Sequence, residues 1–314
     1  MATGRAADAT GWEDGAVMDP RVVGRLRCPV CAEPLTGAAA GAARALRCPR
    51  RHSFDVARQG YVDLLAGRAP HAGDTAEMVA ARADFLAAGH YDPVSTALAA
   101  TARAALEDTP AADGGAESGG GVGAYPLVVD AGAGTGRHLA AVLAALPDAV
   151  GLALDVSKPA LRRAARAHPR AAAALADTWR RLPLADGSVA VLLDVFAPRN
   201  GAEFRRVLHP AGVLLVVTPA GDHLAELVDA LDLLKVDPDK TDRVAGSLVD
   251  HFDRAAETVL RARLDLTAPE VATLVGMGPS ARHTDPAVLA ARIAALPEPV
   301  GVTLAVRLGV YRPR

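Results

Sequence analysis

Residues 127–138, LVVDAGAGTGRH, decide the fold of this chain. A short apolar run over 127–130 ends in a turn that contains Gly132, Gly134 and Gly136, and a helix is expected from about Arg137 onward. A strand that enters a helix through a glycine turn is the first unit of a strand–helix–strand fold. Glycine lets the backbone of such a turn approach a ligand closely, so the turn is also the first candidate binding site.

The sequence after this turn continues to alternate between strand and helix patterns. We expect strands at 149–154, 171–176, 189–196 and 213–218, and helices at 158–168 and 201–208. This order predicts a doubly wound α/β fold, in which a parallel sheet has helices on both faces. A further helix is expected from His223 to about residue 234, and the alternation after Gly301 predicts an edge strand.

The sequence before the turn contains three further kinds of segment. Residues 1–20 lack apolar periodicity and are expected to be a disordered tail. Residues 21–68 hold too few apolar residues for a core of their own, which predicts a small module followed by a main domain over 69–314. Apolar residues at helical spacing predict two helices between 74 and 107, and the glycine-rich residues 109–126 are expected to form a flexible loop.

All three cysteines of the chain lie in the small module. They form two pairs with His52, Cys28-x2-Cys31 and Cys48-x3-His52, separated by sixteen residues. Thiolates and an imidazole presented by two tight turns are typical of a tetrahedral zinc site, and the binding energy of the metal can replace a missing core. Four protein ligands indicate a structural metal, although buried or incidental thiols are the alternative interpretation.

The charge of the chain is unevenly distributed. Residues 21–70 contain nine arginines and three acids, a net charge of +6, which leaves −8 on the rest of the chain. A basic module on an acidic body is expected when one part of a protein must approach phosphates, although an arginine-rich composition alone could also produce it. No apolar leader and no run of about 18 apolar residues is present, so we expect no membrane segment and a cytoplasmic location.

Acidic residues follow the expected strands in a fixed order. Asp130 precedes the glycine turn, Asp155 ends the second strand, and Asp177 follows the third. An acid after the second strand would bind ribose hydroxyls, and the G-x-G-x-G turn differs from the GxGxxG pattern that favours pyrophosphate. The set predicts a class I, Rossmann-like S-adenosylmethionine methyltransferase domain with an N-terminal zinc-binding module. A dinucleotide oxidoreductase is the alternative fingerprint, and Asp177 could instead cap a turn.

Four longer strings give the chain a specific resemblance that covers nearly its whole length. They are CPRRHSFDVARQGYVDLL, GDTAEMVAARADFLAAGHYDP, LDVSK and HPAGVLLVVTPAGDHLAEL. In these the chain resembles the large-subunit ribosomal RNA guanine-N1 methyltransferases of the RlmA and TlrB type.

The resemblance implies a 23S ribosomal RNA substrate, one target guanine in a hairpin loop near the macrolide site, and a homodimer whose zinc modules grip RNA. The TlrB branch is linked to tylosin resistance. It also implies that Tyr91 and His223 lie at the cofactor alongside Gly136, Arg137 and His138.

The expected chemistry narrows the candidates for catalysis. Guanine N1 must lose a proton during methyl transfer, and Asp194 in DVFAP is the candidate acceptor. Methylation at C5 of a pyrimidine is disfavoured because it needs a cysteine nucleophile, and the cysteines are committed to zinc. A small-molecule methyltransferase is the main alternative, since one fold serves many substrates. A second alternative is a zinc-dependent RNA-binding protein with an inactive methyltransferase domain.

Overall fold

The central element of the molecule is an eight-stranded sheet. The computed structural model describes residues 18–40, 43–65, 67, 73–107, 125–233, 246–278 and 285–314. In spatial order the sheet contains β10 (Phe252–Leu266), β11 (Val300–Pro313), β9 (Leu208–Pro219), β8 (Val189–Val195), β5 (Leu127–Ala131), β6 (Val150–Asp155), β7 (Ala171–Leu175) and β4 (Tyr61–Asp63). The strands from β9 to β4 run parallel, and β11 is antiparallel to both its neighbours. This topology confirms the predicted class I, Rossmann-like α/β fold.

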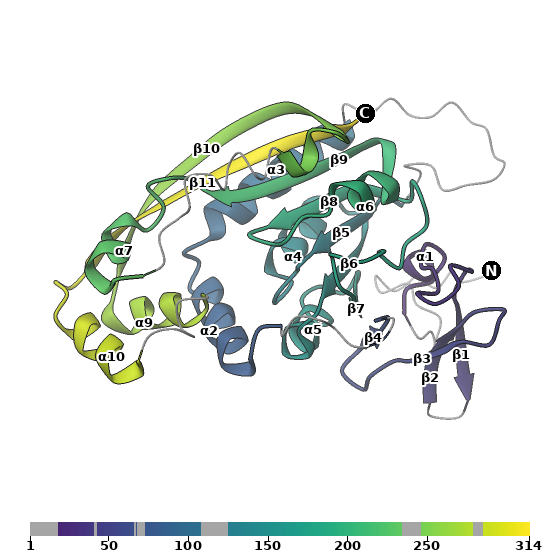
Figure 1. Cartoon of the computed structure of the whole chain (residues 1–314), viewed down its shortest axis with the longest axis horizontal. Coiled ribbons are helices and arrows are strands. Elements are labelled where there is room, and N and C mark those ends of the chain that lie inside the picture. Colours follow the sequence, from purple (N-terminus) through teal and green to yellow (C-terminus); the bar gives the residue numbers. More distant parts are fainter. Residues whose placement is uncertain are drawn as a thin grey trace, which may run out of the picture.

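One face of the sheet is covered by helices from several parts of the chain (Figure 1). They are α2 (Ala76–Ala87), α3 (Asp92–Glu107), α4 (Arg137–Ala145), α5 (Lys158–Ala164), α7 (Ala225–Leu231), α9 (Ala268–Gly276) and α10 (Pro286–Ala294). Their buried side chains, Leu98 and Leu139 among them, pack on the side chains of the parallel strands that point to this face.

The opposite face is covered differently. Only one crossover helix, α6 (Gly201–Val207), packs there, because the β7–β8 connection over 176–188 contains no helix. The short α1 (Pro20–Val23) and Leu26 cover this part of the sheet instead, and Leu26 forms an antiparallel bridge with Leu184. The N-terminal segment thus fills the place of a missing crossover helix.

The zinc module is a three-stranded antiparallel ribbon of β1 (Thr36–Ala40), β2 (Ala43–Arg47) and β3 (Ser53–Asp55). Its buried residues Leu35 and Leu46 belong to the same apolar cluster as Leu184 and the sheet residues of that face. The chain then continues directly into β4, which joins the large sheet beside β7. The ribbon and the main domain therefore share one core, which explains how so small a module is stabilised.

The structure differs from the sequence-based expectations in two places. The prediction that the C-terminal strand is an edge strand is wrong. β10, which the sequence did not reveal, pairs along the outer side of β11 and forms the edge. Met18 and Asp19, expected in the tail, are buried. Asp19 caps α1, and Met18 packs in the apolar cluster that contains Leu46. The rest of the expected tail, 1–17, and most of the expected loop, 108–124, lie outside the described residues. No described helix could cross a membrane.

The shared core generates a prediction for stability. Replacing Leu46, which is fully buried in the ribbon, by alanine should cost about 2–5 kcal/mol of unfolding free energy. Because the ribbon and the sheet share their core, urea unfolding followed by circular dichroism and by tryptophan fluorescence should still give one coincident transition. Val30→Ala, at an exposed ribbon position, is the matched control and should change little. Two separate transitions in the Leu46→Ala variant would contradict a shared core.

Candidate zinc and cofactor sites

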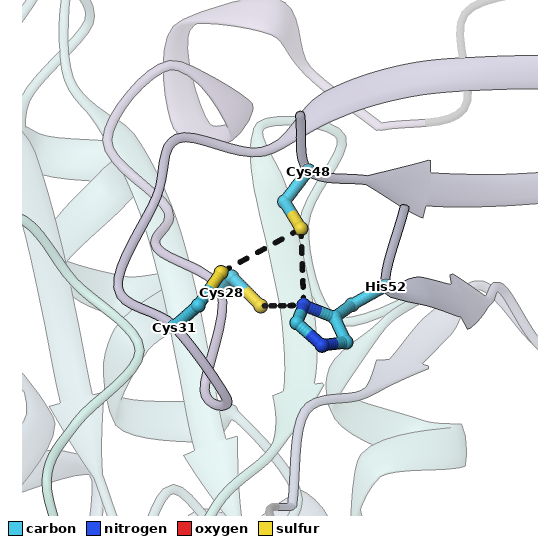
Figure 2. A group of neighbouring side chains, drawn as sticks. All are labelled: Cys28, Cys31, Cys48 and His52. Carbon is cyan, nitrogen blue, oxygen red and sulfur yellow. Dashed lines mark hydrogen bonds between the residues drawn. The ribbon is translucent and has the colours of Figure 1, made fainter. Parts of the chain in front are cut away.

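The four predicted zinc ligands converge in the ribbon (Figure 2). Their ligand atoms all lie within 4.8 Å of one another. His52 Nδ1 lies 3.5 Å from Cys28 Sγ and 3.3 Å from Cys48 Sγ, and the Sγ atoms of Cys31 and Cys48 are 3.7 Å apart. A tetrahedral zinc ion with ordinary bond lengths requires S···S edges of about 3.8 Å and S···N edges of about 3.6 Å. These three distances are close to the edges of a zinc tetrahedron, so the cluster suits zinc, and His52 would bind through Nδ1.

Two tight turns hold these ligands in place. Ala32, after Cys31, and Arg51, before His52, both adopt positive φ angles, 61° and 67°. A backbone hydrogen bond closes each turn: Ala32 N donates to Cys28 O at 2.8 Å, and Arg51 N donates to Cys48 O at 2.9 Å. Burial opposes ionisation of Cys48, but hydrogen bonds from His52 and the neighbouring thiols lower its pKa to about 7. This favours the thiolate that zinc requires.

The glycine loop follows β5 at the carboxyl edge of the parallel strands. Gly132, Gly134 and Gly136 have φ angles of 83°, 54° and 79°, a region that side chains disfavour. A Cβ at Gly132 would also lie 2.5 Å from Ala197 Cβ, and one at Gly136 would lie 3.0 Å from Ala164 Cα. The three glycines are thus required by the conformation of the turn and by its close packing.

Asp155, at the end of β6, is tied to this loop. Its Oδ2 accepts from Gly134 N and its Oδ1 from Ser157 N, both at 2.8 Å. Burial raises the pKa of Asp155 in spite of these two amide bonds. Asp155 is half-buried, and each carboxylate oxygen retains a lone pair for a ligand hydroxyl. A cleft of about 450 Å³ opens beside it, lined in part by Asp63, Asp74 and Lys158.

The other two acids of the predicted set are buried. Asp130 lies under the loop, where burial and the charge of Asp155 raise its pKa to about 7. Asp177 Oδ1 accepts from Trp179 N at 3.0 Å, and its Oδ2 lies 3.6 Å from Arg180 Nε. Asp177 therefore caps the turn after β7, which is the alternative role considered for it from the sequence.

Arg137 and His138 begin α4, but their side chains point toward α3. Arg137 Nη2 pairs with Asp92 Oδ1 at 2.7 Å, and His138 Nδ1 lies 2.9 Å from Ser95 Oγ. Burial, reinforced by nearby arginines, lowers the pKa of His138 to about 4, so this imidazole is neutral at pH 7. In this structure the two side chains fix the helix that follows the loop, and only their backbone lies at the loop itself.

Aromatic rings cluster near the ends of β8 and β9, next to Ala197, which lies against Gly132 of the loop. Tyr91 Oη, from the turn between α2 and α3, lies 3.4 Å from His223 Nε2, after β9. His223 Nδ1 accepts from Ala305 N at 3.3 Å, which places the proton of the neutral ring on Nε2. Phe196, directly after β8, stacks on His223 with ring centroids 6.0 Å apart and lies 6.1 Å from the ring of Tyr91. The structure thus brings Tyr91 and His223 together, as the resemblance implied.

Asp194 is not part of this open site. Its side chain is fully buried within β8 and its Oδ1 lies 3.0 Å from Nε of the nearly buried Arg199. A fully buried carboxylate that is paired with an arginine is not accessible to a substrate in this conformation. The geometry therefore gives no support to Asp194 as proton acceptor.

Sequence reasoning missed two residues that border the loop. Arg82, on α2, binds the Met277 carbonyl at 3.0 Å and pairs with Asp74, and its Nη1 lies 3.3 Å from a Cβ built at Gly134. A single arginine in a helical pattern carries no signal of such a role. Phe196 has a positive φ of 54° and is 40% exposed. An aromatic residue directly after an apolar strand was a signal that could have revealed it.

The ribbon geometry predicts that removing zinc unfolds more than the ribbon. Cys48→Ala should lose the stoichiometric zinc, and with it a metal-binding free energy on the order of 10 kcal/mol. Because the ribbon residues pack in the core of the main domain, the melting temperature of the whole chain should fall. Zinc content by mass spectrometry and a thermal melt measure both effects. Ser53→Ala, on the exposed side of β3, is the control, and an unchanged melt in Cys48→Ala would show that the metal is dispensable.

Comparison with known proteins agrees with this geometry. The family model described as RlmA, N-terminal, a zinc ribbon, matches residues 26–69. A Micromonospora griseorubida protein described as a candidate 23S rRNA (guanine-N1)-methyltransferase is 69% identical over 298 residues, which are 94% of this chain and all of that protein. The 23S rRNA (guanine(748)-N1)-methyltransferase of Streptomyces fradiae is 53% identical over 94% of this chain and 99% of its own length. The chain belongs to the family of S-adenosylmethionine-dependent 23S rRNA guanine-N1 methyltransferases that carry a zinc ribbon.

Proposed function

We propose that this protein transfers the methyl group of S-adenosylmethionine to N1 of a guanine in 23S ribosomal RNA. The observation that carries the proposal is the arrangement at the carboxyl edge of the sheet. There the glycine loop, the Asp155 carboxylate and the exposed Phe196 ring occupy neighbouring strand ends, with Ala197 directly against Gly132. The reaction named for the two near-full-length relatives supports the same assignment.

The residues of this edge suit the cofactor. The turn of Gly132, Gly134 and Gly136 would admit the aminoacyl end at close backbone distance, and the remaining lone pairs of Asp155 would accept the ribose hydroxyls. Tyr91 and His223 would border the sulfonium end. When bound, the cofactor supplies an electrophilic methyl carbon, and the protein must align the nucleophile with it.

Phe196 is the candidate platform for the target base. Its backbone is held at positive φ by a hydrogen bond from Phe196 N to Val217 O at 3.1 Å, and such strain persists only where the surrounding structure fixes it. The strain presents an exposed ring at the edge of the cofactor site, where it would stack on a guanine removed from RNA pairing. N1 lies on the pairing edge of guanine, so the base must be unpaired before it can react.

Proton loss from N1 does not need Asp194 in this arrangement. Partial bonding to the methyl carbon acidifies the N1 proton, and water at the open edge can accept it. Positioning of N1 in line with the methyl carbon therefore accounts for the rate. Asp194 and Arg199 instead form the buried ion pair that supports β8 and the turn after it.

The role of Asp194 can be tested by Asp194→Asn. The variant leaves the Arg199 guanidinium buried without a charged partner, which should cost about 3–5 kcal/mol of stability. Methyl transfer by the folded fraction, measured below its melting temperature, should stay within a few-fold of the parent. A rate lowered by roughly 10²–10⁴ at unchanged stability would instead identify Asp194 as the general base.

The proposed reaction is tested by primer extension on unmodified 23S RNA after incubation with enzyme and S-adenosylmethionine. A methyl on N1 blocks base pairing, so reverse transcription should stop beside one guanine. Asp155→Ala should weaken cofactor binding, which calorimetry measures, and the stop should therefore disappear. Phe196→Ala should leave cofactor affinity unchanged and lower kcat/KM for RNA about 5-fold or more, since a stacked base is worth about 1–3 kcal/mol.

The matched control is Arg103→Gln, an exposed position on α3, which should behave like the parent. Methyl incorporation into a metabolite with no stop in the RNA would favour a small-molecule methyltransferase. Failure of the parent to bind S-adenosylmethionine at all would leave a zinc-ribbon RNA-binding protein.

The finer features implied by the resemblance belong to the same proposal. We infer a target in a hairpin loop near the macrolide site, a protective effect against tylosin, a homodimer and a cytoplasmic location. The position of the primer stop tests the target, and growth of a sensitive host expressing the protein tests resistance. Sedimentation of the purified protein tests the dimer, and fractionation of the native host tests the location.

A further inference from the structure

The loop after β7 exposes a tryptophan between the proposed cofactor site and the strand that continues the zinc ribbon. Trp179 is 55% exposed, and among the described aromatic residues its side chain is the most open to solvent. β7 lies between β6, which ends at Asp155, and β4, which continues the zinc ribbon. Because parallel strands end at a common edge, the loop after β7 lies between the cofactor site and the ribbon-linked strand.

Hydrogen bonds to Asp177 fix the backbone at the start of this loop. Its amide donates to the buried Asp177 Oδ1 at 3.0 Å, and Arg180 N donates to Asp177 O at 3.0 Å, which closes a tight turn. A loop capped by a buried carboxylate has a defined shape, so the backbone of Trp179 is anchored while its indole is exposed.

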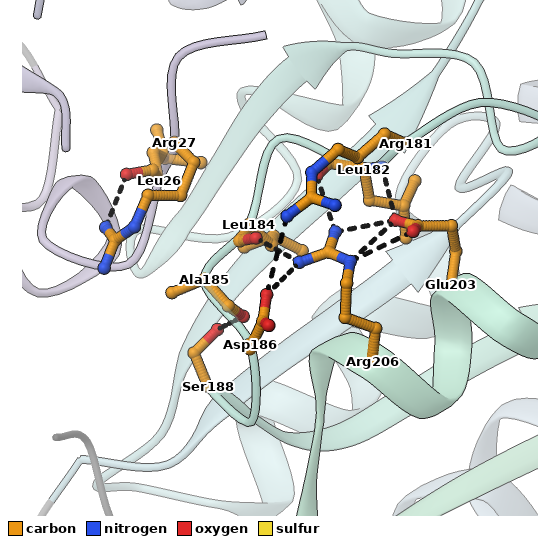
Figure 3. Close-up of polar contacts among 10 residues, drawn as sticks. All are labelled: Leu26, Arg27, Arg181, Leu182, Leu184, Ala185, Asp186, Ser188, Glu203 and Arg206. Carbon is orange, nitrogen blue, oxygen red and sulfur yellow. Dashed lines mark hydrogen bonds and ion pairs between the residues drawn. The ribbon is translucent and has the colours of Figure 1, made fainter. Parts of the chain in front are cut away.

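The other side of the loop is fixed even more firmly (Figure 3). Leu182 and Leu184 are buried, and Arg206 binds their carbonyl oxygens at 3.0 and 2.8 Å. Glu203 accepts from Leu182 N at 2.8 Å and pairs with Arg206 at 2.6 Å. The ribbon is attached here as well, because Arg27 N donates to Pro183 O at 3.0 Å.

Two arginines follow the exposed indole. The side chain of Arg181 is 62% exposed, and its Nη2 lies 3.7 Å from Oδ1 of the exposed Asp186. Arg180 is 40% exposed and its Nε lies 3.6 Å from Asp177 Oδ2. The Arg181–Asp186 pair is exposed at both ends, so it is weak and easily exchanged for another anion, whereas Arg180 pairs with a buried carboxylate and exposes part of its own side chain. An indole with two adjacent guanidinium groups combines a stacking platform with phosphate-binding charges, which is the chemistry of single-stranded nucleic acid recognition.

We propose that Trp179, Arg180 and Arg181, together the WRR loop, form a docking surface for the unpaired RNA that flanks the target guanine. The indole stacks on one unpaired base, and the two arginines bind the phosphates beside it. The WRR loop thereby connects RNA held by the basic ribbon to the base delivered at Phe196. This inference rests on the proposed function for the identity of the RNA.

The test uses the fact that the chain contains two tryptophans. In a Trp12→Phe background Trp179 is the single tryptophan fluorophore, and titration with a 23S hairpin fragment should quench it, whereas S-adenosylhomocysteine alone should not. Trp179→Ala should weaken RNA binding roughly 5- to 150-fold, the range that corresponds to about 1–3 kcal/mol for a stacked base. Trp179→Phe, which keeps an aromatic face, should recover most of the affinity.

The arginines have a separate readout. Converting Arg180 and Arg181 together to glutamine should lower the salt dependence of log K by about 0.7 for each phosphate that the variant no longer neutralises. Arg103→Gln is the matched control and should leave the slope unchanged. Thermal melts show whether each variant is folded, which the exposed positions of these side chains favour.

Two outcomes would overturn the proposal without touching the proposed function. An unquenched Trp179 in an enzyme that still gives the primer stop would show that RNA bypasses the WRR loop. Quenching by S-adenosylhomocysteine, with Trp179→Ala raising KM for the cofactor alone, would make the indole a cover for the cofactor. Absence of the primer stop in the parent, by contrast, would reject the proposed function itself.

Discussion

The convergence of three thiol sulfurs and one imidazole nitrogen on a single metal position is the constraint on which the rest of the structure depends. The ribbon has three short strands and few buried side chains, so the bonds to zinc must fix its turns at Ala32 and Arg51. With the turns fixed, Leu35 and Leu46 are held toward the large sheet, and Leu26 reaches Leu184. The ribbon can then cover the face left open by a β7–β8 connection without a helix, and the metal site contributes to the stability of the main domain.

Sequence patterns revealed the features that depend on local spacing. The convergence of Cys28, Cys31, Cys48 and His52 follows from two short Cys and His pairs, and the strand–glycine–helix unit at β5 follows from a local sequence, so both features were predicted correctly. The antiparallel β10 and the pairing of β4 with β7 depend on contacts between residues far apart in the chain, which periodicity does not encode. Asp194 shows the same limit at a single position. Its place in the DVFAP string suggested chemistry, but its pairing with Arg199 is visible only in three dimensions.

The carboxyl edge of the sheet assembles groups with distinct tasks. The glycine loop and Asp155 are fixed to each other by an amide hydrogen bond, so the proposed cofactor site is formed before any ligand arrives. His138 and Arg137, predicted beside the cofactor, hold α4 against α3 in this structure, and their contact with the cofactor stays a prediction. Phe196 lies at the edge with a positive φ and Trp179 in a firmly held loop, so the backbones that carry both exposed rings are already ordered.

The identity of the methylated atom is the central claim, and nucleoside analysis measures it most directly. 23S RNA treated with enzyme and isotopically labelled S-adenosylmethionine is digested to nucleosides and separated by liquid chromatography with mass detection. The label is expected in a single species that co-elutes with authentic 1-methylguanosine, at no more than one per RNA molecule. Label in N2- or N7-methylguanosine, or in a pyrimidine, would contradict the placement of guanine N1 against the methyl donor at this edge of the sheet.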